Sequence, residues 1–205
     1  MSPQLEIRVD CIEGALNDLS LQLKGGGFAE KVSVESRLDP TSTAWGLQRW
    51  IDSIKRADIE QLACSAKRKG SPSWKVTTLA PGNVPVVAAE SLFLGYLSGV
   101  SHRLALSRRA SIVAKTLFSY LIKRDPSAAL TTQLLVWQEL SQDVRKNALS
   151  SSDCVVVYGH AETVELIHRM IPLSVRLIPH GPCLAVAYLP NASPLLPPLL
   201  PLLSP

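Results

Sequence analysis

The sequence predicts an α/β protein built on an open, mostly parallel sheet with helices on both faces. The first indication is the alternation of short β-type runs with longer helical segments from residue 74 to residue 190, joined by short turns. The second is a strand–turn–helix step, in which the run 74–79 leads through a Pro-Gly turn into the apolar run 84–98. The third is size, because 205 residues with 46% hydrophobic content can bury one sizeable core.

Residues 1–73 are expected to form an N-terminal arm or cap. Apolar residues alternate with charged ones from Leu5 to Val9, which is the period of a strand. The triple glycine at 25–27 is interpreted as a flexible loop that opens no helix. One helix is predicted over 42–66, where apolar residues recur at near-helical spacing, namely Trp45, Leu47, Trp50, Ile51, Ile54, Ile59 and Leu62.

Residues 74–190 are expected to form a nucleotide-binding domain. Strands are predicted at 74–79, 103–106, 132–137, 154–158, 174–178 and 183–188, and helices at 84–98, 110–123, 142–149 and 161–170. The helix at 84–98 is shorter than the roughly 20 residues that a bilayer requires and carries Glu90, so we expect it to pack on the sheet and not to span a membrane. The tail at 191–205 is rich in Leu, Pro and Ser and is expected to be disordered; the alternative is a broken reading frame.

Charge and cysteine usage exclude several classes of function. The net charge is +4, but the basic residues are scattered and only 5% of residues are aromatic, which argues against a nucleic-acid-binding module. The four cysteines form no CxxC pair, which argues against a zinc knuckle or a redox dithiol; they are Cys11, Cys64, Cys154 and Cys183. The first residues lack the apolar core of a signal peptide, so a cytoplasmic protein with reduced thiols is expected.

Three turns carry residues suited to chemistry. In open α/β sheets, ligands gather at the carboxyl ends of strands, where helix N-termini attract anions. The turn at 81–83 places the Asn83 carboxamide where an enzyme would hold a donor for a developing oxyanion. The second turn is Ser107-Arg108-Arg109 and the third is Gly159-His160-Ala161-Glu162. We expect the three turns to line a single crevice.

The second and third turns together could hold a dinucleotide. Two guanidinium groups, on Arg108 and Arg109, suit a ribose 2′-phosphate, and Gly159 at a helix start allows a pyrophosphate to approach the backbone. The alternatives are surface charges for the arginines and a plain turn residue for the glycine. Neither a GxGxxG fingerprint nor a P-loop occurs in the chain.

The order of these motifs resembles the bacterial fatty acyl-CoA reductases of the luciferase operon, within the aldehyde dehydrogenase superfamily. The resemblance covers residues 74–190 and rests on the turn Ala80–Pro85, Gly95, the Leu106-Ser107 pair with its arginines, the run Val155–Gly159 and the run Val175–Gly181. It implies an enzyme in which NADPH reduces a long-chain acyl-CoA to a fatty aldehyde through a cysteine-bound acyl enzyme.

The resemblance also implies roles for single residues. Asn83 would donate a hydrogen bond to the oxyanion of the tetrahedral intermediate. The turn at 158–162 would meet the cofactor pyrophosphate, and Ser107 would lie beside the adenosine ribose. The resulting cofactor-binding set for NADP is Gly82, Ser107, Arg108, Arg109, Gly159, His160 and Glu162. No metal ligand is predicted.

The chain departs from the family pattern at two points. A lysine that contacts the adenosine ribose is replaced by Ala105, unless Arg108 or Arg109 supplies the charge instead. The cysteine nucleophile belongs to a separate domain in this superfamily, so we expect the chain to be a fragment that binds cofactor and does not turn over alone; Cys154 and Cys183 are interpreted as inert buried thiols. A partner chain or a downstream reading frame could supply the missing domain, and a homo-oligomer is also possible. The alternative function is a non-catalytic nucleotide-binding or interaction module, and a glutamyl-phosphate reductase is less favoured.

Overall fold

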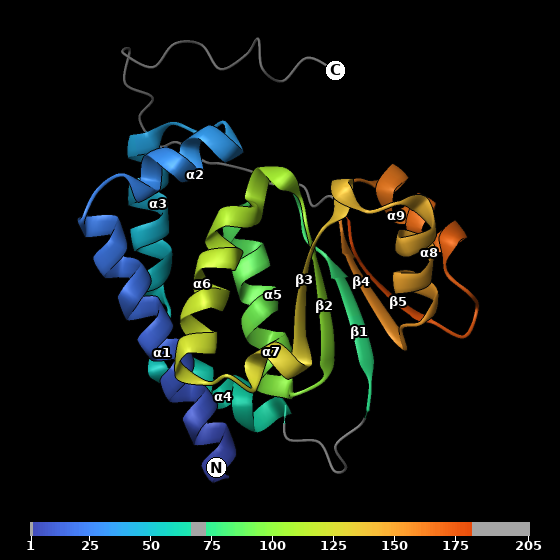
Figure 1. Cartoon of the computed structure of the whole chain (residues 1–205), viewed down its shortest axis with the longest axis horizontal. Coiled ribbons are helices and arrows are strands. Elements are labelled where there is room, and N and C mark those ends of the chain that lie inside the picture. Colours follow the sequence, from blue (N-terminus) through green and yellow to red (C-terminus); the bar gives the residue numbers. More distant parts are fainter. Residues whose placement is uncertain (1, 67–72, 182–205) are drawn as a thin grey trace, which may run out of the picture.

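In the part of the chain that the structure describes, five parallel strands form one sheet, which confirms the predicted α/β class (Figure 1). The computed structural model describes residues 2–66 and 73–181. Across the sheet the strand order is β3-β2-β1-β4-β5, with β1 (Lys75–Leu79), β2 (Ser101–Leu106), β3 (Thr132–Val136), β4 (Cys154–Tyr158) and β5 (Arg176–His180). The chain runs outward from β1 to β3 and then crosses back to β4. The strand order therefore reverses between β1 and β4, which is where open α/β sheets bind ligands.

Two pairs of helices cover the two faces of the sheet (Figure 1). The helices α5 (Pro85–Ser98) and α6 (Ser111–Arg124) lie on one side, and α8 (Gln142–Ser150) and α9 (Ala161–Met170) lie on the other. Strand β2 shows how both faces are buried: Leu104 and Leu106 join the core under α5 and α6, whereas Ala105 joins the core under α8 and α9. Three short segments lie next to strands β2 and β3; they are η1 (Arg108–Ala110), α7 (Ala128–Thr131) and η2 (Trp137–Glu139).

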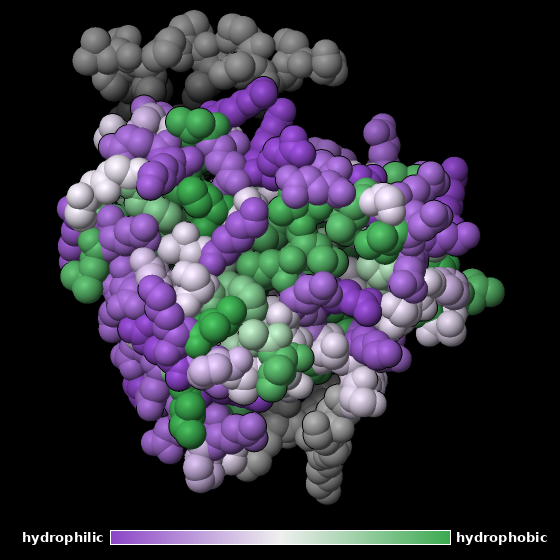
Figure 2. All heavy atoms as spheres, in the orientation of Figure 1, coloured by the Kyte–Doolittle hydropathy of each residue, from purple (hydrophilic) through white to green (hydrophobic). Residues whose placement is uncertain are grey.

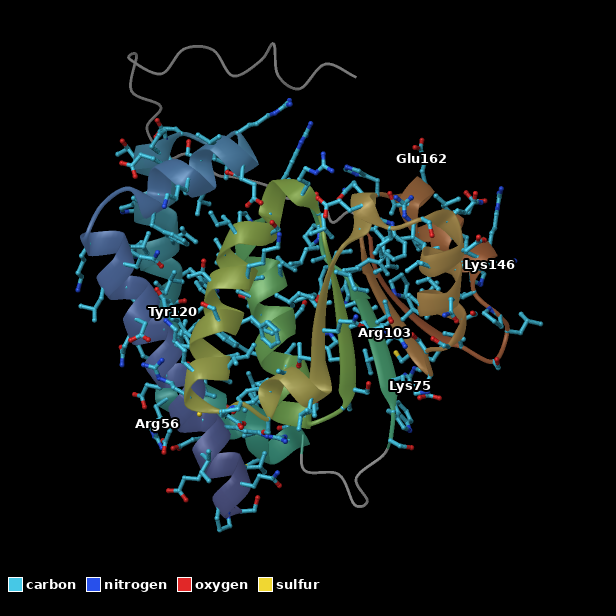
Figure 3. All side chains as sticks on the ribbon, viewed as in Figure 1. Arg56, Lys75, Arg103, Tyr120, Lys146 and Glu162 are labelled. Carbon is cyan, nitrogen blue, oxygen red and sulfur yellow. The ribbon has the colours of Figure 1, made fainter. Side chains whose placement is uncertain are left out.

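Within residues 2–66, four helices precede the sheet and share a core with it. They are α1 (Pro3–Lys24), α2 (Phe28–Ser36), α3 (Pro40–Ser53) and α4 (Arg56–Ala66). One hydrophobic cluster contains buried residues of these helices together with residues of α5, α6 and β2. Polar contacts join α1 to α6, because Arg124 pairs with Asp18 at 2.7 Å and the Tyr120 hydroxyl donates to Gln22 Oε1 at 2.7 Å (Figure 3).

The strand-like period predicted for residues 5–9 is wrong, because these residues lie in α1. The Ser2 hydroxyl accepts from the Leu5 N–H at 3.4 Å and caps the helix. A buried stripe then follows the spacing of a helix at Val9, Ile12, Leu16 and Leu19, whereas Ile7 is 56% exposed. The alternating residues 5–9 are thus the first turns of a helix whose buried face begins at Val9.

Two further predictions for the N-terminal part are wrong. The single helix at 42–66 is broken, because Ile54 leaves the helical region with φ −82° and ψ 113°. The Lys55 N–H then donates to Asp58 Oδ2 at 3.1 Å, which starts a new helix, α4. The glycine loop does open a helix: Gly27, with φ 76°, is the N-cap of α2. Only glycine adopts that left-handed conformation at little cost.

The remaining differences concern the ends of the sheet. Strand β5 begins at Arg176, because residues 172–175 form a turn in which the Val175 N–H donates to the Pro172 carbonyl at 3.0 Å. The predicted strand at 183–188 and the tail at 191–205 lie outside the described residues. Strand β3 is an edge strand with partly exposed side chains, and Figure 2 shows hydrophobic surface over this part of the molecule.

In the two described ranges, no helix combines the length and the apolar character needed to cross a membrane.

Candidate functional site

A crevice of about 700 Å³ lies at the carboxyl ends of the central strands. The three predicted turns all contribute to it, so the expectation that they line one crevice is confirmed. Its lining consists of Leu79, Ala80, Pro81, Gly82, Asn83, Ala105, Ser107, Arg108, Arg109, Trp137, Gln138, Tyr158, Gly159, His160, Thr163, Leu166 and Ile167. Parallel strands end at one edge of a sheet, which is why turns distant in sequence meet here.

The first turn is held against the second. The Ala80 N–H donates to the Ala105 carbonyl at 2.9 Å, which continues the pairing of β1 with β2 beyond the strand. A Cβ at Gly82 would lie 2.7 Å from Ser107 Oγ, so the close approach of the two turns requires glycine at this position. The exposed Asn83 follows directly, before Pro85 starts α5.

The second turn presents two cations to the crevice. The Ser107 hydroxyl accepts from the Arg109 N–H at 3.4 Å, and the Arg108 N–H donates to Gln138 Oε1 at 3.0 Å. The Arg108 guanidinium lies 3.5 Å from Glu139 in a solvent-exposed pair, which contributes little to stability. The Arg109 guanidinium has no carboxylate partner among the described residues. It is therefore available to an anion.

The third turn opens helix α9. The Gly159 N–H donates to the His180 carbonyl at 3.1 Å, and a Cβ on Gly159 would lie 3.0 Å from the Thr163 side chain. His160 is the N-cap and makes no side-chain capping bond, so the first N–H groups of α9 are not satisfied by a cap. Together with the helix dipole, these groups favour an anion at this end of the crevice.

Glu162 is the predicted site residue that the structure does not bring into the crevice. It lies in the first turn of α9 but is exposed and is absent from the crevice lining. Figure 3 shows its side chain pointing away from the body of the domain. An acidic residue at this position is favourable to the N-terminus of the helix.

Sequence reasoning missed an apolar wall of the crevice. Trp137 and Gln138 follow β3, whereas Leu166 and Ile167 come from α9, and all four line the crevice. Leu166 is 59% exposed and adds apolar surface to the crevice. A signal for Trp137 was present, because it is the last residue of the strand predicted at 132–137 and the other predicted site residues also lie near the carboxyl ends of predicted strands.

A second cavity, of about 430 Å³, lies on the other side of Asn83. Asn83 contributes to the lining of both cavities. The second cavity is formed by α2, α3 and the start of α5, and its walls are mostly apolar, with Val32, Leu38, Gly46, Leu47, Trp50, Val84, Pro85 and Val86 beside Asp39, Ser42 and Thr43.

None of the thiols in the described residues lines either cavity. Cys11 and Cys154 are buried and Cys64 is exposed on α4. Burial raises the pKa of the Cys154 thiol, which makes it a poor nucleophile. Cys183 lies outside the described residues. Ala105 is 1% exposed on the crevice floor and brings no charge to the site.

The fold is similar to that of part of the aldehyde dehydrogenases of known structure. The NADP-dependent glyceraldehyde-3-phosphate dehydrogenase of Bacillus halodurans C-125, complexed with NADP, superposes with a TM-score of 0.68 at 16% identity, over 87% of this chain and 40% of that chain. Aldehyde dehydrogenase 21 of Physcomitrella patens gives a TM-score of 0.66 at 13% identity, over 86% and 40% of the two chains. A propionaldehyde dehydrogenase of Clostridium phytofermentans gives 0.55 at 14% identity, over 88% and 42%.

The chain belongs to the acyl-CoA reductase (LuxC) family, whose sequence profile matches residues 53–195. This confirms the resemblance that the motifs indicated. No curated protein sequence matches the chain. The chain spans about 40% of the length of the solved structures that it resembles, and at these identities the likeness establishes the fold.

Proposed function

We propose that the chain is the cofactor-binding part of an enzyme that reduces a long-chain acyl-CoA to the fatty aldehyde with NADPH. Membership of the acyl-CoA reductase family supports the thioester substrate. Similar solved structures contain NADP in two cases and NAD⁺ in two others, which supports a nicotinamide cofactor. The observation that carries the proposal is the crevice, in which the uncapped start of α9 and two arginines share one cavity of about 700 Å³.

The residues of the crevice fit NADP. Gly82 and Gly159 lie where a side chain would collide with its neighbours, so the backbone beside the cavity stays open to a ligand. The first N–H groups of α9 would bind the pyrophosphate. Arg108 and Arg109 would pair with the ribose 2′-phosphate, which distinguishes NADP from NAD. When bound, the cofactor supplies the hydride.

Asn83 would act on the reacting carbonyl group. It lies where the crevice meets the second cavity, so a thioester placed between the two would present its oxygen to the Asn83 carboxamide. The apolar walls of the second cavity suit an aliphatic chain. We propose that the cysteine nucleophile comes from a part of the enzyme outside the described residues, since the three described thiols lie away from both cavities.

The direct test is a calorimetric titration of the chain with NADPH and, separately, with NADH. We expect NADPH to bind more tightly than NADH. The double variant R108A/R109A should weaken NADPH binding by about tenfold or more, because hydrogen bonds between charged groups contribute about 1.5–3 kcal/mol each, and should leave NADH binding nearly unchanged.

Arg169→Ala is the control for loss of positive charge outside the site. Arg169 is an exposed arginine on α9 that pairs with Glu165 and does not line the crevice, so its loss removes one of the two charges that R108A/R109A removes, without touching the site. Equal NADPH affinity of the wild-type chain and R108A/R109A would refute the 2′-phosphate role. Failure of the wild-type chain to bind either nucleotide would refute the proposed function.

A second test addresses turnover. The chain is mixed with a long-chain acyl-CoA and NADPH, and the absorbance of NADPH is followed. We expect no sustained oxidation, because no thiol of the described residues reaches the crevice. Sustained thiol-dependent oxidation by the chain alone would show that the nucleophile is already present in it.

A further inference from the structure

The crevice has two chemically different walls. One wall is polar and basic, with Ser107, Arg108, Arg109 and His160. The other is apolar and is made largely by Trp137 and Leu166, with Ile167 and Leu79 beneath them. A nucleotide has the same division, because its phosphates are anionic and its base is a flat ring. The apolar wall is therefore suited to the base.

Trp137 is held in place from two directions. Arg145 of α8 donates from Nε to the Trp137 carbonyl at 3.0 Å, and its guanidinium lies 5.6 Å from the centre of the indole ring. The indole also packs against the apolar core under α8 and α9. A ring that is already fixed loses little conformational entropy when a ligand stacks on it.

Gln138, the next residue, provides a polar contact beside the ring. Its Oε1 accepts from the Arg108 N–H at 3.0 Å. Its Nε2 group has no partner among the described residues and lines the same crevice. A hydrogen-bond donor next to an aromatic face can contact a ring nitrogen of a base that stacks on that face.

We infer that Trp137 stacks on the adenine ring of the nucleotide and sets the affinity of the crevice for that half of the cofactor. This inference rests on the proposed function, because it requires a nucleotide in the crevice. It goes beyond that function by assigning recognition of the base to one side chain. Arg145 then acts as a positioning residue, since it contacts Trp137 and does not line the crevice.

The test compares Trp137→Leu and Trp137→Phe with the wild-type chain. Calorimetry measures binding of NADPH, of adenosine 2′,5′-bisphosphate, and of nicotinamide mononucleotide, which lacks the adenine. Stacking of a base on an aromatic side chain contributes about 1–3 kcal/mol, so W137L should weaken binding of both adenine-containing ligands by about tenfold. W137F keeps an aromatic ring and should remain within about threefold of wild type. Binding of nicotinamide mononucleotide should not change.

Trp45→Leu is the control. Trp45 is exposed on α3 and lines neither cavity, so its loss should leave all three affinities unchanged. Intrinsic fluorescence gives a second measurement that tolerates a poorly folded W137L. Adenosine 2′,5′-bisphosphate should quench the wild-type and W45L proteins, and the quenching should be largely lost in W137F.

The outcomes separate this inference from the proposed function. If the wild-type chain binds NADPH and W137L binds it equally well, the Trp137 inference is overturned while the proposed function stands. Unchanged quenching in W137F overturns it in the same way. If the wild-type chain binds no adenine nucleotide, both the inference and the proposed function are overturned.

Discussion

His102 is a buried histidine in the middle of the sheet. It is 2% exposed, and its Nε2 shares a hydrogen bond with Thr78 Oγ1 at 3.0 Å. Burial lowers the pKa of His102 to about 4. A Cβ on Gly95 would lie 2.1 Å from His102 Nδ1, so the ring fits only because residue 95 is glycine. Single small residues thus decide which side chains can be buried here.

Acid is expected to destabilise the protein through His102. The folded state favours the neutral ring, because burial lowers the pKa of His102 from 6.5 to about 4. The free energy of unfolding is therefore highest above pH 6.5 and falls as the pH decreases toward about 4. The loss at pH 4 is about 3 kcal/mol relative to a protein without this histidine. Urea unfolding of the wild-type protein and of His102→Gln at pH 7, 5.5 and 4.5 measures this loss of stability. Parallel pH profiles of the two proteins would contradict the prediction.

A methyl group at Gly82 should damage the site without damaging the fold. Gly82→Ala places a Cβ 2.7 Å from Ser107 Oγ and pushes the first two turns apart. We expect NADPH binding to weaken by about tenfold, or about 1.4 kcal/mol, while the urea midpoint barely changes because Gly82 is partly exposed and lies outside both hydrophobic clusters. Gly46→Ala is the control, since its Cβ would meet nothing within 4 Å and a helical alanine should stabilise by about 0.5–1 kcal/mol.

At the scale of single elements, α1 shows how a charged helix becomes part of the core. Its apolar stripe lies against α6 and α5, and its polar side carries ion pairs. Arg56 of α4 contacts three carboxylates, two of them on α1: Asp10 at 2.7 Å, Glu13 at 2.7 Å and Glu60 at 2.9 Å (Figure 3). These carboxylates raise the pKa of Arg56. The pairs are largely exposed, so apolar packing is the main source of stability.

Two leucines of α1 test that account. Leu19 is fully buried and Leu21 is 67% exposed. Leu19→Ala should lower the free energy of unfolding by about 2–5 kcal/mol, because it leaves a cavity in the core. Leu21→Ala should change it by less than about 0.5 kcal/mol. Denaturant unfolding measures both, and similar losses for the two variants would mean that the packing of α1 contributes little.

At the scale of the whole molecule, the hydrophobic core crosses from the N-terminal helices into the sheet domain. One cluster includes Ile12 of α1, Leu47 of α3, Leu92 of α5 and Leu117 of α6. A second cluster on the opposite face of the sheet contains Val155, Val157 and Ile167. Removal of the first four helices would expose the apolar faces of α5 and α6 to water.

A shortened chain that starts at residue 74 is therefore expected to fold poorly. It should bind the dye ANS and unfold without a cooperative transition, because half of the larger core is missing. Near-ultraviolet circular dichroism and urea unfolding, compared with the full chain, measure this. A cooperative transition with a native near-ultraviolet spectrum would show that the sheet domain is independent of residues 1–73.

The sequence predicted the sheet domain better than the helices before it. Buried parallel strands between helices have a local pattern that a reader can recognise, and the strands 75–79 and 154–158 were predicted within one residue. The start of α1 was misread because five residues suit a period of 2 as well as one of 3.6. The break at Ile54 was also missed, because the apolar spacing continues through it. The new helix begins there with a cap in which the Asp58 carboxylate accepts from the Lys55 N–H.

By itself, the sequence determined the fold class, the order of the strands along the chain and the three turns that carry Gly82, Arg108 and Gly159. Each of these depends on neighbours within a few residues. Only the tertiary structure decided that β3 lies beside β2, that Trp137 and Leu166 line the same crevice as the arginines, and that Asn83 lines two cavities. Those features require contacts between distant segments, because the lateral order of strands and the packing of helices on them are settled only when the whole core is buried.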